Sequence, residues 1–126
     1  MDQIGDIVIA EYEGSNIQGT VKDVNRGAKE VCVETDVQQF WFSPEHLYAI
    51  PLDEKELLHL GFVKERLPEG GAKYKKDSFR LLLSKEGDFS QFDIWWREDK
   101  RHIQQPIFVH ELQNHYYDMT KIELNP

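Results

Sequence analysis

The residues best suited to chemistry lie near the end of the chain, where His110, Glu111 and His115 share one predicted helix. A helical zinc site of the protease type needs two histidines four residues apart, so that both reach one metal ion. Here the separation is five residues, which turns the second imidazole by roughly 140° around the helix. We therefore predict ordinary hydrogen bonding for these side chains and no metal site.

No other pattern in the sequence indicates catalysis. The pair Gly70-Gly71 lacks the spacing and the following Lys-Ser/Thr of a phosphate-binding loop, and no Gly-x-Ser-x-Gly turn for acyl transfer is present. Cys32 is the single cysteine and lies in a predicted strand beside Glu30 and Glu34, whose carboxylates would raise the pKa of its thiol. We predict a noncatalytic protein that needs no cofactor.

Aromatic side chains offer a binding surface instead. In the first half, five apolar residues occupy the outward register of the predicted strands: Val8, Ala10, Tyr12, Cys32 and Trp41. Trp95 is likewise out of register with the core residues of its own strand. Either the rest of the chain covers these side chains or a protein partner does, and aromatic residues are enriched at protein interfaces. Tyr12, Trp41 and Trp95 are our candidate contact residues for an unidentified protein partner.

A second surface suits single-stranded nucleic acid. Its candidate residues are basic and lie on or beside predicted strands: Lys73, Lys75, Lys76 and Arg80. The same strands carry Tyr74 and Trp95, and basic strands with exposed aromatic rings hold single strands by phosphate contacts and stacking. Lysines also have a structural explanation here, because they protect an edge strand against aggregation. Nucleic acid is therefore the alternative partner.

Composition limits the class of protein and its surroundings. The chain has 126 residues, 40% hydrophobic and 30% charged, with a net charge of −8, which is typical of a globular protein. Residues 1–52 hold nine acids and three bases, and residues 53–126 hold fourteen acids and twelve bases, so only the second half could attract phosphates. No apolar run approaches the roughly 20 residues of a membrane span, and the first residues lack the order of a signal peptide. We expect a cytoplasmic protein without membrane contact, and the sequence sets no oligomeric state.

Residues 1–51 form the first predicted lobe. Short alternating apolar runs separated by turns at 14–16 and 25–27 predict antiparallel strands, with Ile7, Ile9, Phe40 and Phe42 facing inward. A one-turn helix at 43–46 precedes the last of five strands. This order of elements resembles a five-stranded SH3-like β-barrel.

Residues 52–126 form the second predicted lobe, which we expect to pack with the first as one unit of α+β class. A short helix over 52–60, capped by Asp53, should precede a three-stranded antiparallel meander over 72–97 and a solvated turn over 97–102. The last helix should begin near Pro106 and pack across the meander. Its apolar stripe follows steps of three, four and three residues: Val109, Leu112, Tyr116 and Met119.

The whole chain resembles a family of short uncharacterised bacterial proteins. The resemblance is carried by Ile50-Pro51-Leu52, by Gly61-Phe62, and above all by Val109-His110-Glu111-Leu112-Gln113-Asn114 with the pair Tyr116-Tyr117. Lys121 stands where the family usually has glycine. Members occur in gut-bacterial genomes, often near phage or mobile-element genes, and they bring no known activity or ligand. The resemblance implies an accessory factor of a phage or mobile element that acts through protein contacts.

Overall fold

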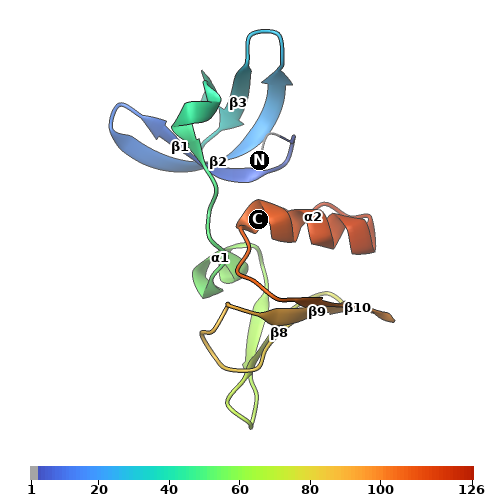
Figure 1. Cartoon of the computed structure of the whole chain (residues 1–126). Coiled ribbons are helices and arrows are strands. Elements are labelled where there is room, and N and C mark those ends of the chain that lie inside the picture. Colours follow the sequence, from blue (N-terminus) through green and yellow to red (C-terminus); the bar gives the residue numbers. More distant parts are fainter. Residues whose placement is uncertain (1–2) are drawn as a thin grey trace. The chain divides into compact units, whose positions relative to one another are not determined.

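The computed structural model describes residues 3–126 and contains two antiparallel β-sheets of five strands each (Figure 1). Strands hold 44% of the residues and helices 17%. The chain divides into two compact units, the first formed by Met1–Ile50 with Phe108–His110 and the second by Pro51–Ile107 with Glu111–Pro126. The protein is mostly β, so the predicted α+β class was wrong.

The first sheet has the strand order β4-β3-β2-β1-β5. Its elements are β1 (Ile7–Tyr12), β2 (Ser15–Asn25), β3 (Glu30–Glu34), β4 (Gln39–Phe42), the 3-10 turn η1 (Pro44–His46) and β5 (Leu47–Tyr48). In the described residues β4 and β5 are not paired with each other, so the predicted closed SH3-like barrel was wrong. β5 has only two residues and pairs with β1 through Ile9 and Ala10, which leaves β4 and β5 as the two edges of an open sheet.

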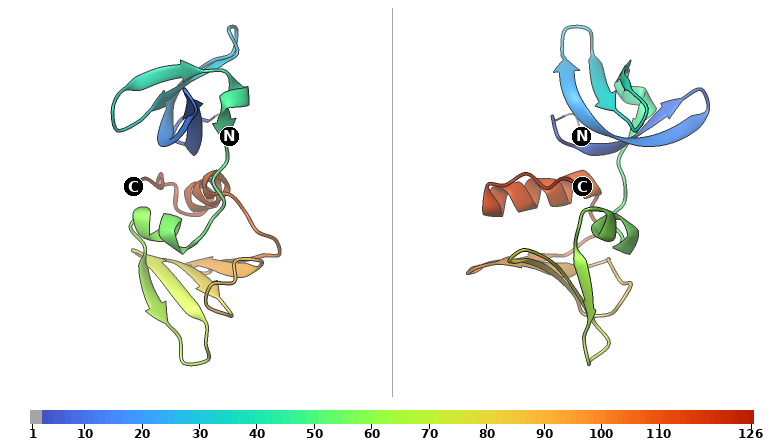
Figure 2. Two further views of the ribbon diagram at one scale, coloured as in Figure 1. Left: turned by 90° about the vertical axis from the view of Figure 1, so that its left-hand side faces the viewer. Right: turned by 180° about the vertical axis from the view of Figure 1, so that it is seen from behind.

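This sheet is strongly curved (Figure 2). The pairing of β2 with β3 shifts by one residue between Val21 and Asp23, and the resulting bulge lets both Val21 and Val24 pack toward the core. The two strands also approach closely at Gly19, where an added Cβ would lie 2.6 Å from the carbonyl oxygen of Glu34. Bulges and glycines are the usual means of bending a sheet, and here the bend allows strands that are not neighbours to face each other.

The second sheet is a continuous meander with the order β10-β9-β8-β7-β6. Its strands are β6 (Val63–Arg66), β7 (Ala72–Lys76), β8 (Phe79–Leu83), β9 (Phe92–Trp96) and β10 (Asp99–Ile103). The predicted three-stranded meander was wrong because β6 and β10 were missed, and β10 had been assigned to a solvated turn. Both are edge strands composed mainly of charged residues, which protects an edge but removes the alternation that reveals a strand.

The short helix α1 (Glu54–His59) confirms the predicted helix capped by Asp53, although it is shorter than the expected range of 52–60. The Asp53 carboxylate accepts a hydrogen bond from the Glu56 N–H at 2.9 Å, which satisfies one of the free donors at the helix start. Gly61, at φ +91°, adopts the left-handed conformation that ends the segment.

The last helix, α2 (Val109–Thr120), begins three residues after Pro106, because the preceding segment forms backbone hydrogen bonds. The Leu52 N–H donates to the Ile107 carbonyl at 3.0 Å. The predicted apolar stripe is buried, with Val109, Leu112, Tyr116 and Met119 each at most 6% exposed. The centroid of the Tyr116 ring lies 4.7 Å from that of Phe79 on β8. Figures 1 and 2 show α2 running along the second sheet.

Lys121 ends α2 in the left-handed conformation, with φ +62° and its N–H donating to the Tyr117 carbonyl at 2.7 Å. This is the position where glycine would fit without strain. No helix within residues 3–126 has the length and apolar character needed to cross a membrane.

Candidate functional site

An aromatic cleft opens on the first unit where β1 faces β4. The rings of Tyr12 and Phe40 stack with their centroids 4.9 Å apart, and Phe42 stands edge-on to both at 6.5 and 6.1 Å. These two strands are not neighbours in the sheet, so the curvature of the sheet creates the contact. The cleft has a volume of about 330 Å³.

The register of β1 differs from the one expected from sequence. Val8 and Ala10 are fully buried in the core of the first unit together with Val31, Val33 and Phe42, so their predicted outward position was wrong. Ile7 is also buried, and apolar residues on both faces of β1 leave no alternation to set the register. Tyr12 shares the inward register of Ala10 but remains 41% exposed because it lies at the end of the strand.

Trp41 borders the same cleft and is 47% exposed. It lies opposite Cys32 in the pairing of β3 with β4, in the register that alternates with Phe40 and Phe42. Cys32 itself is buried, and burial, followed by the nearby charges of Asp23 and Glu34, raises the pKa of its thiol. The direction agrees with the prediction from sequence, but the main cause is burial, and the contributing carboxylates are Asp23 and Glu34 rather than Glu30 and Glu34.

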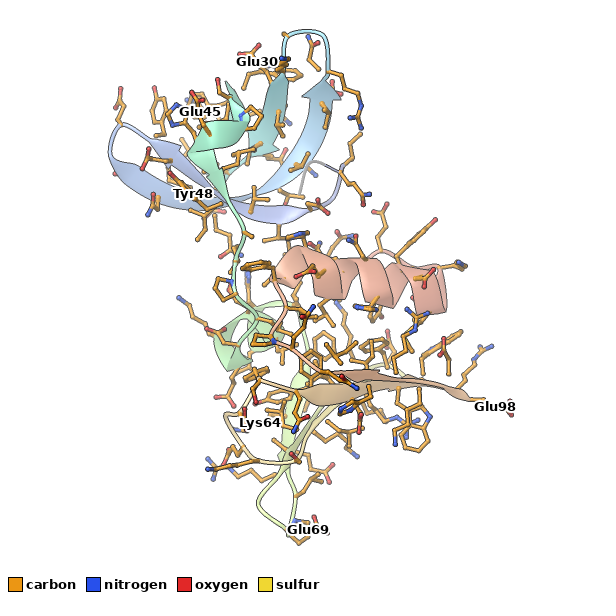
Figure 3. All side chains as sticks on the ribbon, in the orientation of Figure 1. Glu30, Glu45, Tyr48, Lys64, Glu69 and Glu98 are labelled. Carbon is orange, nitrogen blue, oxygen red and sulfur yellow. The ribbon has the colours of Figure 1, made fainter. Side chains whose placement is uncertain are left out.

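Carboxylates surround the aromatic floor of the cleft. Glu11, Glu13 and Glu30 line the cleft. The Nδ1 of His46 lies 3.5 Å from the carboxylate Oε1 of Glu11. In the described residues neither Glu13 nor Glu30 forms an ion pair with a basic side chain. Figure 3 shows Glu30 at the start of β3 and Glu45 on η1. The cleft thus combines an apolar floor with a negatively charged rim.

A contrasting surface lies on the second sheet, where residues of four neighbouring strands pair in one row. Lys75 lies opposite Arg80, Arg80 opposite Trp95, and Trp95 opposite Lys100. We call these four residues the cationic row. The guanidinium carbon of Arg80 is 4.4 Å from the ring centroid of Trp95, and the Lys100 ammonium is 5.3 Å from it. The Trp95 Nε1 donates to the Arg97 carbonyl at 2.6 Å.

The other basic residues predicted for nucleic acid have partners within the chain. Lys73 pairs with Glu65 at 3.4 Å. Lys76 lies in the opposite register to Lys75, and its ammonium donates to the backbone carbonyls of Leu60 at 2.6 Å and Asn125 at 3.0 Å. Lys100 was missed because its strand had been predicted as a turn. Within residues 3–126 no carboxylate forms an ion pair with Lys75, Arg80 or Lys100.

A polar cluster in the second unit is satisfied internally. The Lys64 ammonium forms ion pairs with Glu54 and Glu86, and the Tyr74 hydroxyl donates to Glu54 at 2.8 Å. The hydrogen bonds from Lys64 hold the pKa values of both glutamates below their usual range. Burial and the bond to Glu54 raise the pKa of Tyr74 to about 12. Each group of this cluster therefore has a partner within the chain.

The histidines of α2 lie apart from any metal-like arrangement. Among residues 3–126, no group of three or more His, Cys, Asp and Glu side chains is placed to hold a metal ion. The His115 Nδ1 lies 3.2 Å from Arg101, whose guanidinium also donates to Asp118 at 2.8 Å. Burial, followed by the charge of Arg101, lowers the pKa of His115.

Neither family models, nor curated proteins, nor solved structures give a match to this chain. Its function must therefore be inferred from its own geometry.

Proposed function

We propose that this chain is a noncatalytic protein-interaction module whose contact site is the aromatic cleft of the first unit. The observation that carries the proposal is the stacked pair of Tyr12 and Phe40, which remains open to solvent at the floor of a cleft of about 330 Å³. Exposed aromatic rings in a concave site are typical anchors of protein interfaces. Trp41 at the border of the cleft enlarges the contact area.

The same proposal includes the setting of the protein. A cytoplasmic location is supported by the single cysteine, Cys32, which has no partner for a disulfide within the chain. A role as an accessory factor of a phage or mobile element is supported by the sequence resemblance around Val109–Asn114 and Tyr116-Tyr117.

Selection of short random peptides on the immobilised full chain tests the contact site. Tyr12→Ala should weaken the selected binders by about tenfold or more, because a central aromatic anchor is lost. Tyr48→Ala is the matched control, since Tyr48 is 45% exposed on the same sheet but does not line the cleft. Far-UV circular dichroism should be unchanged in both variants. Binders that tolerate Tyr12→Ala would place the contact site elsewhere and refute the proposal.

Binding of single-stranded nucleic acid to the cationic row is the second candidate function. It is favoured by three basic side chains in one row that have no carboxylate partner among the described residues: Lys75, Arg80 and Lys100. Since cations already cover Trp95, phosphate contacts should contribute more than base stacking.

A labelled single-stranded oligonucleotide tests this second candidate by its mobility shift at low salt. The double substitution Lys75→Glu with Lys100→Glu should abolish binding, and added salt should weaken it. Lys55→Glu with Lys85→Glu makes the same change of net charge outside the row. If no shift occurs at low salt, or if both double variants behave alike, the row is not a nucleic-acid site.

A further inference from the structure

We infer that the cleft accepts a lysine or arginine side chain from a basic segment of its protein partner. This inference rests on the proposed function and specifies the chemistry of the occupant. The floor and the rim of the cleft support it separately, because aromatic faces and carboxylates both attract cations.

The floor offers an aromatic face of the right kind. Tyr12 stacks on Phe40 and is 41% exposed, so a side chain can approach the stacked pair from solvent. An aromatic face carries a negative quadrupole, and an ammonium or guanidinium placed over it gains attraction. The aliphatic stem of lysine or arginine would lie against the apolar walls, as these stems do on other apolar surfaces.

The rim supplies complementary charge. Glu11, Glu13 and Glu30 line the cleft, and the only basic side chain among its lining residues is His46. Residues 1–52 contain three lysines and arginines, of which Lys22 pairs with Glu34 at 3.7 Å. Among the described residues, no lysine or arginine forms an ion pair with Glu11, Glu13 or Glu30. Their negative charge would attract a basic partner and repel an acidic one.

The second unit shows what this chain does with aromatic faces when its own cations are available. Arg80 covers Trp95, and the guanidinium carbon of Arg97 lies 4.3 Å from the ring of Trp96. The described part of the chain places no lysine or arginine over Tyr12 or Phe40 in this way. A lysine or arginine of a partner would make in the cleft the cation–π contact that the second unit makes with its own arginines.

Glu13 permits a test that separates binding from folding. Tyr12 pairs with Ser15, so Glu13 and Gly14 form a two-residue hairpin turn, with φ +50° and φ +79°. Asparagine and aspartate both suit the first position of such a turn better than glutamate does. Glu13→Asn and Glu13→Asp should therefore each raise the melting temperature by about 2 °C or more. Only Glu13→Asn removes the carboxylate from the cleft.

The binding experiment uses the full chain and fluorescein-labelled peptides in which glycine alternates with arginine, glutamate or leucine. The arginine peptide should bind, more weakly as salt rises. Glu13→Asn should weaken its binding by about threefold to tenfold and Glu13→Asp should retain most of it. Glu69→Asn is the control for net charge, because this exposed glutamate lies in the second unit and should leave affinity unchanged.

Each contrary result has a distinct meaning. If the glutamate or leucine peptide binds at the cleft and loses affinity with Tyr12→Ala, the occupant is not cationic, while the proposed function stands. If the arginine peptide binds equally to wild type, Tyr12→Ala and Glu13→Asn, its binding depends only on the net charge of −8 of the whole chain. The inference is then wrong. If no peptide of any class binds, both the inference and the proposed contact site fail.

Discussion

The aromatic cleft of the first unit and the cationic row of the second unit are built from similar parts. Each combines aromatic rings and charged groups on an antiparallel sheet. In the cationic row the charges are positive, and Arg80 and Lys100 lie against Trp95. In the cleft the charges are negative, and Tyr12, which stacks on Phe40, remains 41% exposed.

The difference teaches that exposure of an aromatic residue is a poor guide to binding unless its neighbours are considered. Trp95 and Tyr12 were equivalent candidates in the sequence, since both were judged out of register with the core. In the structure Trp95 already makes cation–π contacts and a hydrogen bond to Arg97, which stabilise the second sheet. Tyr12 instead lies beside carboxylates that would strengthen the attraction of an external cation.

The largest effect should come from removing the curvature that creates the cleft. Gly19→Ala would place a methyl group 2.6 Å from the Glu34 carbonyl oxygen, at a position where backbone must move. We expect a loss of about 2 to 3 kcal/mol in the free energy of unfolding, measured by urea denaturation, and loss of peptide binding. Gly27→Ala is the control, because the nearest atom would be 3.5 Å away. Equal stability of the two variants would show that β2 and β3 can separate without cost.

A pH effect should appear in the internally satisfied polar cluster of the second unit. The pKa of Tyr74 is raised to about 12, so the folded protein keeps a proton that the unfolded chain releases near pH 10. The stabilisation is complete below about pH 10 and is lost as pH rises through about 12, by about 1 to 2 kcal/mol. Tyr74→Phe should reduce the slope of this part of the stability profile, and the remaining slope should come from Lys64, whose pKa is raised by its hydrogen bonds to Glu54 and Glu86, and from Tyr116, whose pKa is raised by burial. Tyr117→Phe, which removes a tyrosine hydroxyl from an exposed position of the same unit, is the control variant.

A smaller effect is expected for the contact that distinguishes the cationic row. Arg80→Ala removes the guanidinium from the face of Trp95 and should lower the free energy of unfolding by about 1 kcal/mol. Lys75→Ala, in the same row but without a ring contact, should change it by less than about 0.5 kcal/mol. Thermal denaturation of the two variants measures the difference. A neutral Arg80→Ala would mean that Trp95 is as available to a partner as Tyr12.

Local signals in the sequence predicted part of this fold. The Asp53 cap and the apolar stripe of α2 were correctly identified, because each depends on residues within a few positions of one another. The edge strands β6 and β10 were not, since their charged residues carry no periodic apolar signal. Whether the barrel closes depends on pairing between β4 and β5, which lie at opposite ends of the sheet order. No local pattern in the sequence indicates whether these two strands pair.

The candidate site was only half visible from the sequence for the same reason. Tyr12 and Trp41 were singled out, but their link to Phe40, Glu13 and Glu30 arises from curvature at Gly19 and at the bulge after Val21. Lys100 was missed with its strand, although it completes the cationic row. Gly19, within an otherwise regular strand, was the signal in the sequence for a close approach of two backbones. The strand that approaches it could not be identified without the pairing of β2 with β3.

The finest test of the comparison uses the charge around each tryptophan. A variant that keeps only Trp41 carries its fluorophore beside the acidic cleft, and a variant that keeps only Trp95 carries it beside Arg80 and Lys100. The other tryptophans are replaced by phenylalanine. Caesium should quench the Trp41 variant more efficiently than it quenches the Trp95 variant, and iodide should do the reverse, each by roughly twofold because local potentials concentrate counterions.

Added salt should reduce both differences, since exposed charges are screened within a Debye length of about 10 Å at moderate ionic strength. Acrylamide, which is uncharged, provides the correction for simple exposure, because Trp41 is 47% exposed and Trp95 is only partly exposed. If caesium and iodide quench both variants in the same ratio after this correction, the two surfaces do not differ in potential. In that case the preference of the cleft for a cationic partner would lose its electrostatic basis, and only the open aromatic face would remain to select an occupant.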